Sequence, residues 1–346
     1  MKAKDILIML AALSAGALLL IFPKEMAQAV SLSCKDCLEI IIPSLFPFTV
    51  FAVFLQKSGL YRTVLKPLSL PLSKLLKADE ELCGLILLSN IGGYPVGARL
   101  LSEEVRAGRL NKTDAERLLC CCFGSGPSFV IGLAGLRVFG SAAVGAVIYC
   151  GCLISSLIIA RFLASGIALR VTPAEACEKK RGAECFISSV TDGARVMFTV
   201  CAMIVGFAVL SRMAELCAEQ FAVALFADGS PLSVLLEVSC VRELSPSRAW
   251  ALPFCAAALS FGGVCVQLQV AALGAGLSTK LLLLSRIPAA AISALVSCFA
   301  FLLPKSAAPA VADGTAVGAF SSSALLSVCV AAMSCILLIT AKQRRG

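Results

Sequence analysis

The chain has 346 residues, of which 59% are hydrophobic and only 15% are charged, and its mean hydropathy is +0.94. Soluble domains carry about 25% charged residues, so this composition excludes an ordinary soluble protein. The net charge of +9 does not indicate a nucleic-acid partner, because Lys and Arg lie in short loops between apolar stretches, as in the cytoplasmic loops of membrane proteins. The sequence predicts an all-α, multi-pass protein of the cell membrane, surrounded by the lipid bilayer.

The absence of His from the whole sequence limits the chemistry that we expect. His is the commonest metal ligand and the usual proton carrier near neutral pH. Enzymes need a nucleophile with its base, or a metal. We therefore expect no cofactor, no metal and no enzyme, and any proton coupling falls to carboxylates.

The first apolar run ends near Phe22 and is followed by Ala27-Gln28-Ala29, which leaves open a cleaved signal peptide. We expect instead a retained membrane helix, with residues 1–33 as an N-terminal unit. A second span follows at 38–56. The motif Cys34-Lys35-Asp36-Cys37 is expected in the loop between them, where a redox role is open but a metal site is not indicated.

The stretch 81–101 is apolar but is interrupted at Gly92-Gly93-Tyr94-Pro95. Basic loops, 57–80 and 102–117, flank it on both sides. If the stretch crossed the membrane, one basic loop would lie outside, against the usual charge rule. The Gly and Pro residues supply a turn, so we predict a re-entrant hairpin that enters from the cytoplasm and returns.

Residues 118–136 then cross outward with a break at Gly124-Ser125-Gly126-Pro127, and residues 141–163 return. Residues 34–163 form the first predicted repeat. A basic cytoplasmic linker, 164–185, follows it.

The second half starts on the opposite side of the membrane. Residues 186–210 run outward into a loop that contains Glu215, Glu219 and Asp228. Residues 231–249 are too short and too polar to span, so they predict a second hairpin, entering from outside.

Three further spans complete the prediction of about eight. Residues 250–276 cross inward with a break at Phe261-Gly262-Gly263, and 281–303 cross outward. Residues 322–340 return, within a C-terminal unit 304–346 that ends in a basic tail. Residues 186–303 thus repeat the first unit with inverted topology, an arrangement typical of transporters, and both chain termini are expected in the cytoplasm.

The breaks and hairpins carry the candidate site. Freed backbone groups and half-helix ends bind small ions, although glycines also permit close helix packing and Gln267 could serve only an interhelical hydrogen bond. The predicted substrate-binding residues are Asn90, Gly92, Gly93, Tyr94, Pro95, Gly97, Arg99, Ser125, Gly126, Pro127, Gly262, Gly263 and Gln267.

Glu237 is the carboxylate that we expect to couple transport to H⁺ or Na⁺, because ionisable groups at membrane depth are usually functional. The alternatives are an ion pair with Arg242 or a surface position. Asp192 and Arg195 are expected to form a structural pair at a helix start.

Four stretches carry a resemblance: "IIIPSLFPFTVFAVFL", "SNIGGYPVGARLLSEEVRAGRLNKTDAERLL", "GSGPSFVIG" and "SFGGVCVQLQV". In this order they resemble the YlbJ-type sporulation integral membrane proteins, of the nucleoside-recognition or Gate domain superfamily. The resemblance implies a spore-forming bacterium and transport of dipicolinate, a small aromatic dicarboxylate.

The expected function is therefore a permease for a small anionic solute. A nucleoside or cation carrier and a non-transporting sporulation scaffold are the alternatives, and a homo-oligomer is left open.

Overall fold

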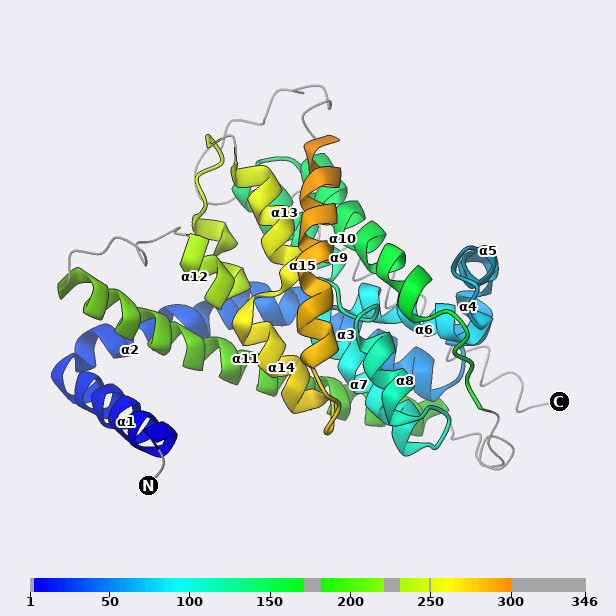
Figure 1. Cartoon of the computed structure of the whole chain (residues 1–346), viewed down its shortest axis with the longest axis horizontal. Coiled ribbons are helices and arrows are strands. Elements are labelled where there is room, and N and C mark those ends of the chain that lie inside the picture. Colours follow the sequence, from blue (N-terminus) through cyan, green and yellow to red (C-terminus); the bar gives the residue numbers. More distant parts are fainter. Residues whose placement is uncertain (1–2, 171–181, 221–230, 249, 300–346) are drawn as a thin grey trace.

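The computed structural model describes residues 3–170, 182–220, 231–248 and 250–299, and these ranges form a bundle of helices without strands (Figure 1). Within them, five helical stretches are long and apolar enough to cross a membrane. They are Pro23–Lys57, Ala142–Leu163, Gly182–Cys217, Ala251–Leu273 and Lys280–Ser297. The prediction of an all-α polytopic membrane protein is confirmed. The predicted helix 322–340 lies outside the described residues.

The N-terminal region differs from its prediction. Helix α1 (Ala3–Ile21) is followed directly by α2 (Pro23–Asp36), a π-helical turn η1 (Cys37–Ile41) and α3 (Ile42–Lys57). The loop predicted at Cys34–Cys37 is therefore wrong, because no Gly or Pro follows Pro23 until Pro43 and the helix continues. Both cysteines are free thiols.

The basic stretch 57–80 contains two short helices, α4 (Tyr61–Val64) and α5 (Lys66–Leu76). The predicted hairpin follows as α6 (Glu80–Gly92) and α7 (Tyr94–Arg106), which meet at Gly93. Both free ends of this pair lie beside α4. A Cβ on Gly84 of α6 would lie 3.2 Å from the Tyr61 ring, and Tyr61 belongs to one buried cluster with Leu85 of α6 and Leu100 of α7.

The next span is broken over a longer stretch than predicted. Helix α8 (Lys112–Leu119) ends before residues 120–126, which are not helical, and α9 (Pro127–Phe129) continues into a π-helical segment, η2 (Val130–Val138). Helix α10 (Ala142–Leu163) follows as predicted.

Helix α11 (Gly182–Gln220) is longer than the predicted span 186–210. The loop expected at Glu215 and Glu219 is wrong, since both residues continue the helix, while Asp228 lies outside the described residues. Helix α11 runs alongside α2 and α3 (Figure 1).

The second hairpin consists of α12 (Pro231–Leu236) and a short 3₁₀ helix, η5 (Val238–Glu243). Helices α13 (Ala251–Phe261) and α14 (Gly263–Leu273) form the second broken span, and α15 (Lys280–Ser297) packs beside α13 and α10 (Figure 1). Trp250 lies at the start of α13, with its ring 5.5 Å from that of Phe254 and 5.5 Å from the Arg248 guanidinium.

The basic segments meet at one end of the bundle. The Gly166 amide donates to the Lys77 carbonyl at 3.4 Å, and the Arg170 amide donates to the Arg109 carbonyl at 2.9 Å. The two loops that flank the first hairpin therefore lie at the same end, as a hairpin requires. That this end faces the cytoplasm stays a prediction.

Candidate functional site at the meeting of two hairpins and two broken helices

The turn of the first hairpin contacts the first broken helix. Gly93 has φ 95° and ψ 173°, a conformation that is essentially restricted to glycine. A Cβ on Gly93 would lie 3.5 Å from the Gly126 amide nitrogen. At Gly97, one turn further along α7, a Cβ would collide with the Cys122 carbonyl oxygen. These glycines let the hairpin backbone lie directly against the break.

Side chains satisfy the carbonyls that the first break leaves without helical partners. Asn90 donates from Nδ2 to the Cys121 carbonyl at 3.1 Å and also to the Ile86 carbonyl at 2.8 Å. The Ser156 hydroxyl donates to the Phe123 carbonyl at 3.3 Å. Asn90, predicted to bind substrate, here stabilises the break.

The second half repeats this contact between a hairpin and a broken helix. Gly262 and Gly263 both have positive φ, of 89° and 66°. A Cβ on Gly263 would lie 3.2 Å from the Leu235 carbonyl and 3.3 Å from the Val238 amide, at the turn of the second hairpin. Gln267 donates to the Phe261 carbonyl at 2.9 Å across the break, and its own buried side-chain oxygen has no partner among the described residues.

The two halves meet through aromatic side chains. The Tyr94 hydroxyl donates to the Leu259 carbonyl of α13, and the Tyr94 and Phe123 ring centroids are 5.0 Å apart. A Cβ on Gly262 would lie 2.5 Å from Phe123 Cζ. The first hairpin, the first break and the second break are thus in one contact group.

A narrow cleft lies beside this contact group. It is lined by residues of both hairpins and both broken helices, together with α3 and α11: Ile41, Leu45, Tyr94, Pro95, Gly126, Phe129, Val200, Ile204, Glu237, Val238, Ser239, Val266 and Gln269. Its volume is about 30 Å³, and one water needs about 10–15 Å³ by this measure. In this conformation the cleft has room for water or a small ion but not for an organic solute.

Glu237 faces the cleft from the turn of the second hairpin. It is 4% exposed, and its Oε1 accepts from the Ser239 amide at 3.1 Å while its Oε2 has no hydrogen-bond partner. Burial raises the pKa of Glu237 above its usual value of 4.5, although the Cys265 thiol and Arg242 oppose this. Arg242 pairs with Asp36 and Glu243 instead, so among the described residues Glu237 has no ion-pair partner.

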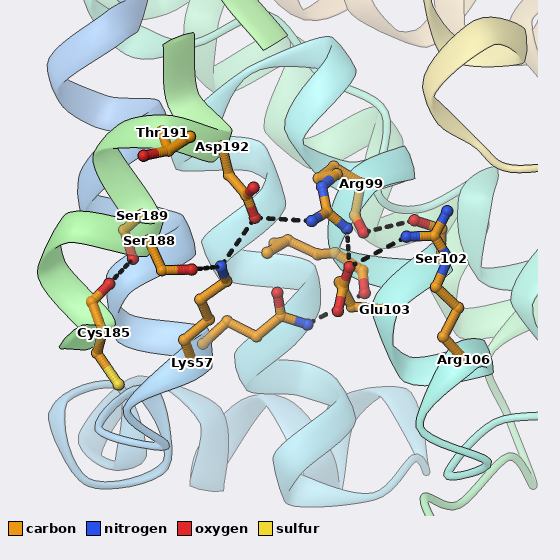
Figure 2. Close-up of polar contacts among 12 residues, drawn as sticks. Lys57, Arg99, Ser102, Glu103, Arg106, Cys185, Ser188, Ser189, Thr191 and Asp192 are labelled. Atoms are coloured by element: carbon orange, nitrogen blue, oxygen red, sulfur yellow. Dashed lines mark hydrogen bonds and ion pairs between the residues drawn. The ribbon is translucent and has the colours of Figure 1, made fainter. Parts of the chain in front are cut away.

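A cluster of charges joins the first hairpin to α3 and α11. Figure 2 shows the Asp192 carboxylate between Lys57, at 2.8 Å, and Arg99, at 2.7 Å. Arg99 also pairs with Glu103 one turn along α7. The predicted pair of Asp192 with Arg195 is wrong, because Arg195 is exposed and the carboxylate faces α3 and α7.

The predicted residues Asn90, Gly93, Gly262, Gly263 and Gln267 lie at the turns and breaks as described above, and the other eight divide into three groups. Tyr94, Pro95 and Gly126 line the cleft. Gly92, Gly97 and Pro127 shape the backbone, since Pro127 begins α9 and a Cβ on Gly92 would lie 2.7 Å from Val96 Cγ1.

Arg99 and Ser125 form the third group, outside the cleft lining. Arg99 forms ion pairs with Glu103 and Asp192. These pairs would have to break before Arg99 could attract an anionic solute. The buried Ser125 hydroxyl lies near Tyr94 and Cys152 but has no partner of good geometry.

Arg286, a fully buried guanidinium in α15, is not among the predicted site residues. An arginine inside an apolar span is a signal by itself. Besides the neighbouring Ser285 hydroxyl, Arg286 donates to two carbonyls that lie more than 160 residues away along the chain, and no local pattern indicates these carbonyls.

Among known proteins, no family model and no solved structure matches this chain. A curated relative, the sporulation integral membrane protein YlbJ of Bacillus subtilis (strain 168), is 28% identical over 111 residues. The match covers 31% of this chain and 26% of that protein, so it spans about a quarter of the relative. Membership of this chain in the Gate domain superfamily stays a prediction. The chain is a multi-pass membrane protein that resembles, over about a third of its length, a membrane protein of sporulation.

Proposed function

We propose that this protein is a transporter for a small organic anion in the cell membrane, and that dipicolinate is its substrate during sporulation. The observation that carries the proposal is the cleft at which two hairpin turns meet two broken helices. Inverted repeats with discontinuous helices at the substrate site are a transporter architecture. The similarity to a sporulation membrane protein supports the biological setting.

Transport requires a second conformation, because the cleft as described excludes an organic solute. The polar groups of the two turns would then face the solute after the hairpins separate. Glu237 is the group that we assign to coupling with H⁺ or Na⁺, because it faces the cleft and lacks an ion-pair partner in the described part of the chain.

The test is uptake into proteoliposomes that contain the purified full chain. We expect labelled dipicolinate to accumulate faster than in protein-free liposomes, and a labelled nucleoside to accumulate at the protein-free rate. Nucleoside uptake without dipicolinate uptake would favour the nucleoside carrier. Uptake of neither solute would favour the scaffold and contradict the proposal.

A further inference from the structure

Arg286 lies in the first half of α15, a helix long and apolar enough to cross the membrane. Its side chain is 0% exposed, and it is the largest of the fully buried side chains in the described part of the protein. No carboxylate there forms an ion pair with it. A charge in this position is costly unless a partner of opposite charge joins it.

The guanidinium is directed at the first broken helix. Its Nη1 donates to the Phe123 carbonyl at 3.2 Å, and its Nη2 donates to the Cys120 carbonyl. Its Nε and Nη2 also donate to the neutral hydroxyl of Ser285, at 3.4 and 3.3 Å. It also lies 4.8 Å from the centroid of the Phe123 ring. These contacts hold the side chain against the break, on the α15 side.

Satisfying two carbonyls does not require a charge. In the same break the neutral amide of Asn90 donates to the Cys121 carbonyl, and the neutral hydroxyl of Ser156 donates to the Phe123 carbonyl. The positive charge of Arg286 is therefore in excess of what the local hydrogen bonds need. A planar guanidinium matches a carboxylate, which it can bind with two parallel hydrogen bonds.

Arg286 is one aromatic ring away from the cleft. The Phe123 ring contacts both the guanidinium and the Tyr94 ring. The centroids of the Phe123 and Tyr94 rings are 5.0 Å apart. Tyr94 lines the cleft. The Ser125 hydroxyl, two residues from Phe123, is buried and without a partner. A displacement of the Phe123 side chain would open this position to the cleft.

We propose that Arg286 is the group that binds a carboxylate of the transported solute, with the hydroxyls of Ser125 and Tyr94 as neighbouring donors and Phe123 as the side chain that covers it in the present conformation. This inference rests on the proposed function and deepens it. A carboxylate would neutralise the buried charge, whereas a neutral solute of the same shape would not. The site would therefore select anions.

Two measurements on the purified full chain test the inference. The first is the melting temperature in detergent with increasing dipicolinate, or with its neutral diamide, pyridine-2,6-dicarboxamide. The second is dipicolinate uptake into proteoliposomes. The variants are Arg286→Gln and Arg286→Lys. Arg286→Gln keeps hydrogen-bond donors and removes the charge, whereas Arg286→Lys keeps the charge and removes the planar group that can form two parallel hydrogen bonds.

We expect dipicolinate, and not the diamide, to raise the melting temperature of the wild type. Arg286→Gln should lose this rise and lose at least tenfold in uptake at low solute concentration. Arg286→Lys should retain part of both. Size-exclusion profiles without solute establish whether each variant folds. If Arg286→Gln does not fold, Arg286→Lys is the deciding variant. Binding by Arg286→Lys as tight as in the wild type would overturn the proposed pair of parallel hydrogen bonds between guanidinium and carboxylate.

The outcomes separate this inference from the proposed function. Unchanged uptake and stabilisation in Arg286→Gln would overturn the role of Arg286 and leave the transporter proposal standing. Charge-dependent stabilisation of the wild type without uptake would support the carboxylate site and contradict transport. Stabilisation by the diamide equal to that by dipicolinate would overturn the inference, and the absence of both binding and uptake would overturn both.

Discussion

At the scale of single residues, the glycines of the turns and breaks determine how closely backbone segments approach. Gly93 and Gly108 both have positive φ, at the start and shortly after the end of α7. Only Gly93 touches the broken helix, since a Cβ on Gly108 would meet nothing within 4 Å. A comparison of substitutions at the two positions therefore distinguishes the effect of backbone strain, which both share, from the effect of contact with the broken helix, which Gly93 alone of the two makes.

We predict that Gly93→Val abolishes dipicolinate uptake, whereas Gly108→Val reduces only stability. Both substitutions place a side chain in a strained backbone conformation, which costs about 1–3 kcal/mol. The measurement is uptake per amount of protein in the membrane, with melting temperature as the control. Normal uptake by Gly93→Val would mean that the turn has only a packing role.

Glu237 makes stability dependent on pH. Its pKa is raised by burial above the usual 4.5, so the folded state holds a proton that the unfolded state releases. The contribution of Glu237 to stability should be greatest below pH 4.5 and should fall as pH rises through the raised pKa. We predict that Glu237→Gln removes this fall, and that the exposed neighbour Glu243→Gln does not. Melting temperatures from pH 4.5 to 9 measure the difference.

The same substitution tests coupling. If Glu237 carries the coupled proton, uptake by Glu237→Gln should no longer respond to a pH gradient, while membrane insertion stays normal. Uptake that responds to the gradient as in the wild type would remove Glu237 from the mechanism.

At the scale of elements, ion pairs connect each hairpin to other helices of the bundle. Arg99 of α7 pairs with Asp192 of α11, which also pairs with Lys57 of α3 (Figure 2). Near the end of α7, the buried Glu104 accepts from Gln56 and pairs with Arg109. In the described part of the second hairpin, the ion pair to another element is that of Arg242 with Asp36.

We predict that Asp192→Asn loosens α7 from α3 and α11, because Lys57 and Arg99 would lose the carboxylate that lies between them, although Arg99 would keep its pair with Glu103. The loss should cost about 1–3 kcal/mol and appear as a lower melting temperature in detergent. Arg195→Gln, an exposed charge change on the same turn of α11, is the matched control. Equal melting temperatures for the two variants would contradict the role given to this cluster.

At the scale of the whole molecule, the basic segments collect at one end of the bundle through the bonds of Lys77 with Gly166 and of Arg109 with Arg170. The turn between α14 and α15 joins them, since the Ser278 amide donates to the Glu116 carboxylate at 2.8 Å. The pair of Arg242 and Asp36 joins the second hairpin to α2.

We predict that single cysteines at Lys74 and Lys112, in a Cys-depleted chain, react with an impermeant thiol reagent from the cytoplasmic side only. A cysteine at Ser247, beyond the second hairpin, should react from the opposite side. Right-side-out and inverted vesicles give the comparison. Reaction of Lys74→Cys and Lys112→Cys from opposite sides would rule out the first hairpin.

The sequence allowed prediction of those features that depend on local backbone chemistry. The breaks at Gly93 and Gly262 were predictable, because glycines at these points permit positive φ. The continuity of α2 into α3 could also have been predicted, because no Gly or Pro interrupts residues 24–42. The full length of α11 could not, since it continues past its apolar segment where it packs along α2 and α3. The ion-pair partners of Asp192 and the two carbonyls that accept from Arg286 lie on elements far away in the chain, and only the fold brings them together.

Trp250 has a use that follows from its position. It is the single tryptophan of the chain, and it stands between the second hairpin and α13 with the Arg248 guanidinium over its ring. A cation against an indole changes the intensity and wavelength of its emission. A change of backbone conformation between the second hairpin and α13 would alter this contact, so the native fluorescence of the unlabelled protein gives a time-resolved optical signal of movement at this junction, with no second tryptophan to contribute.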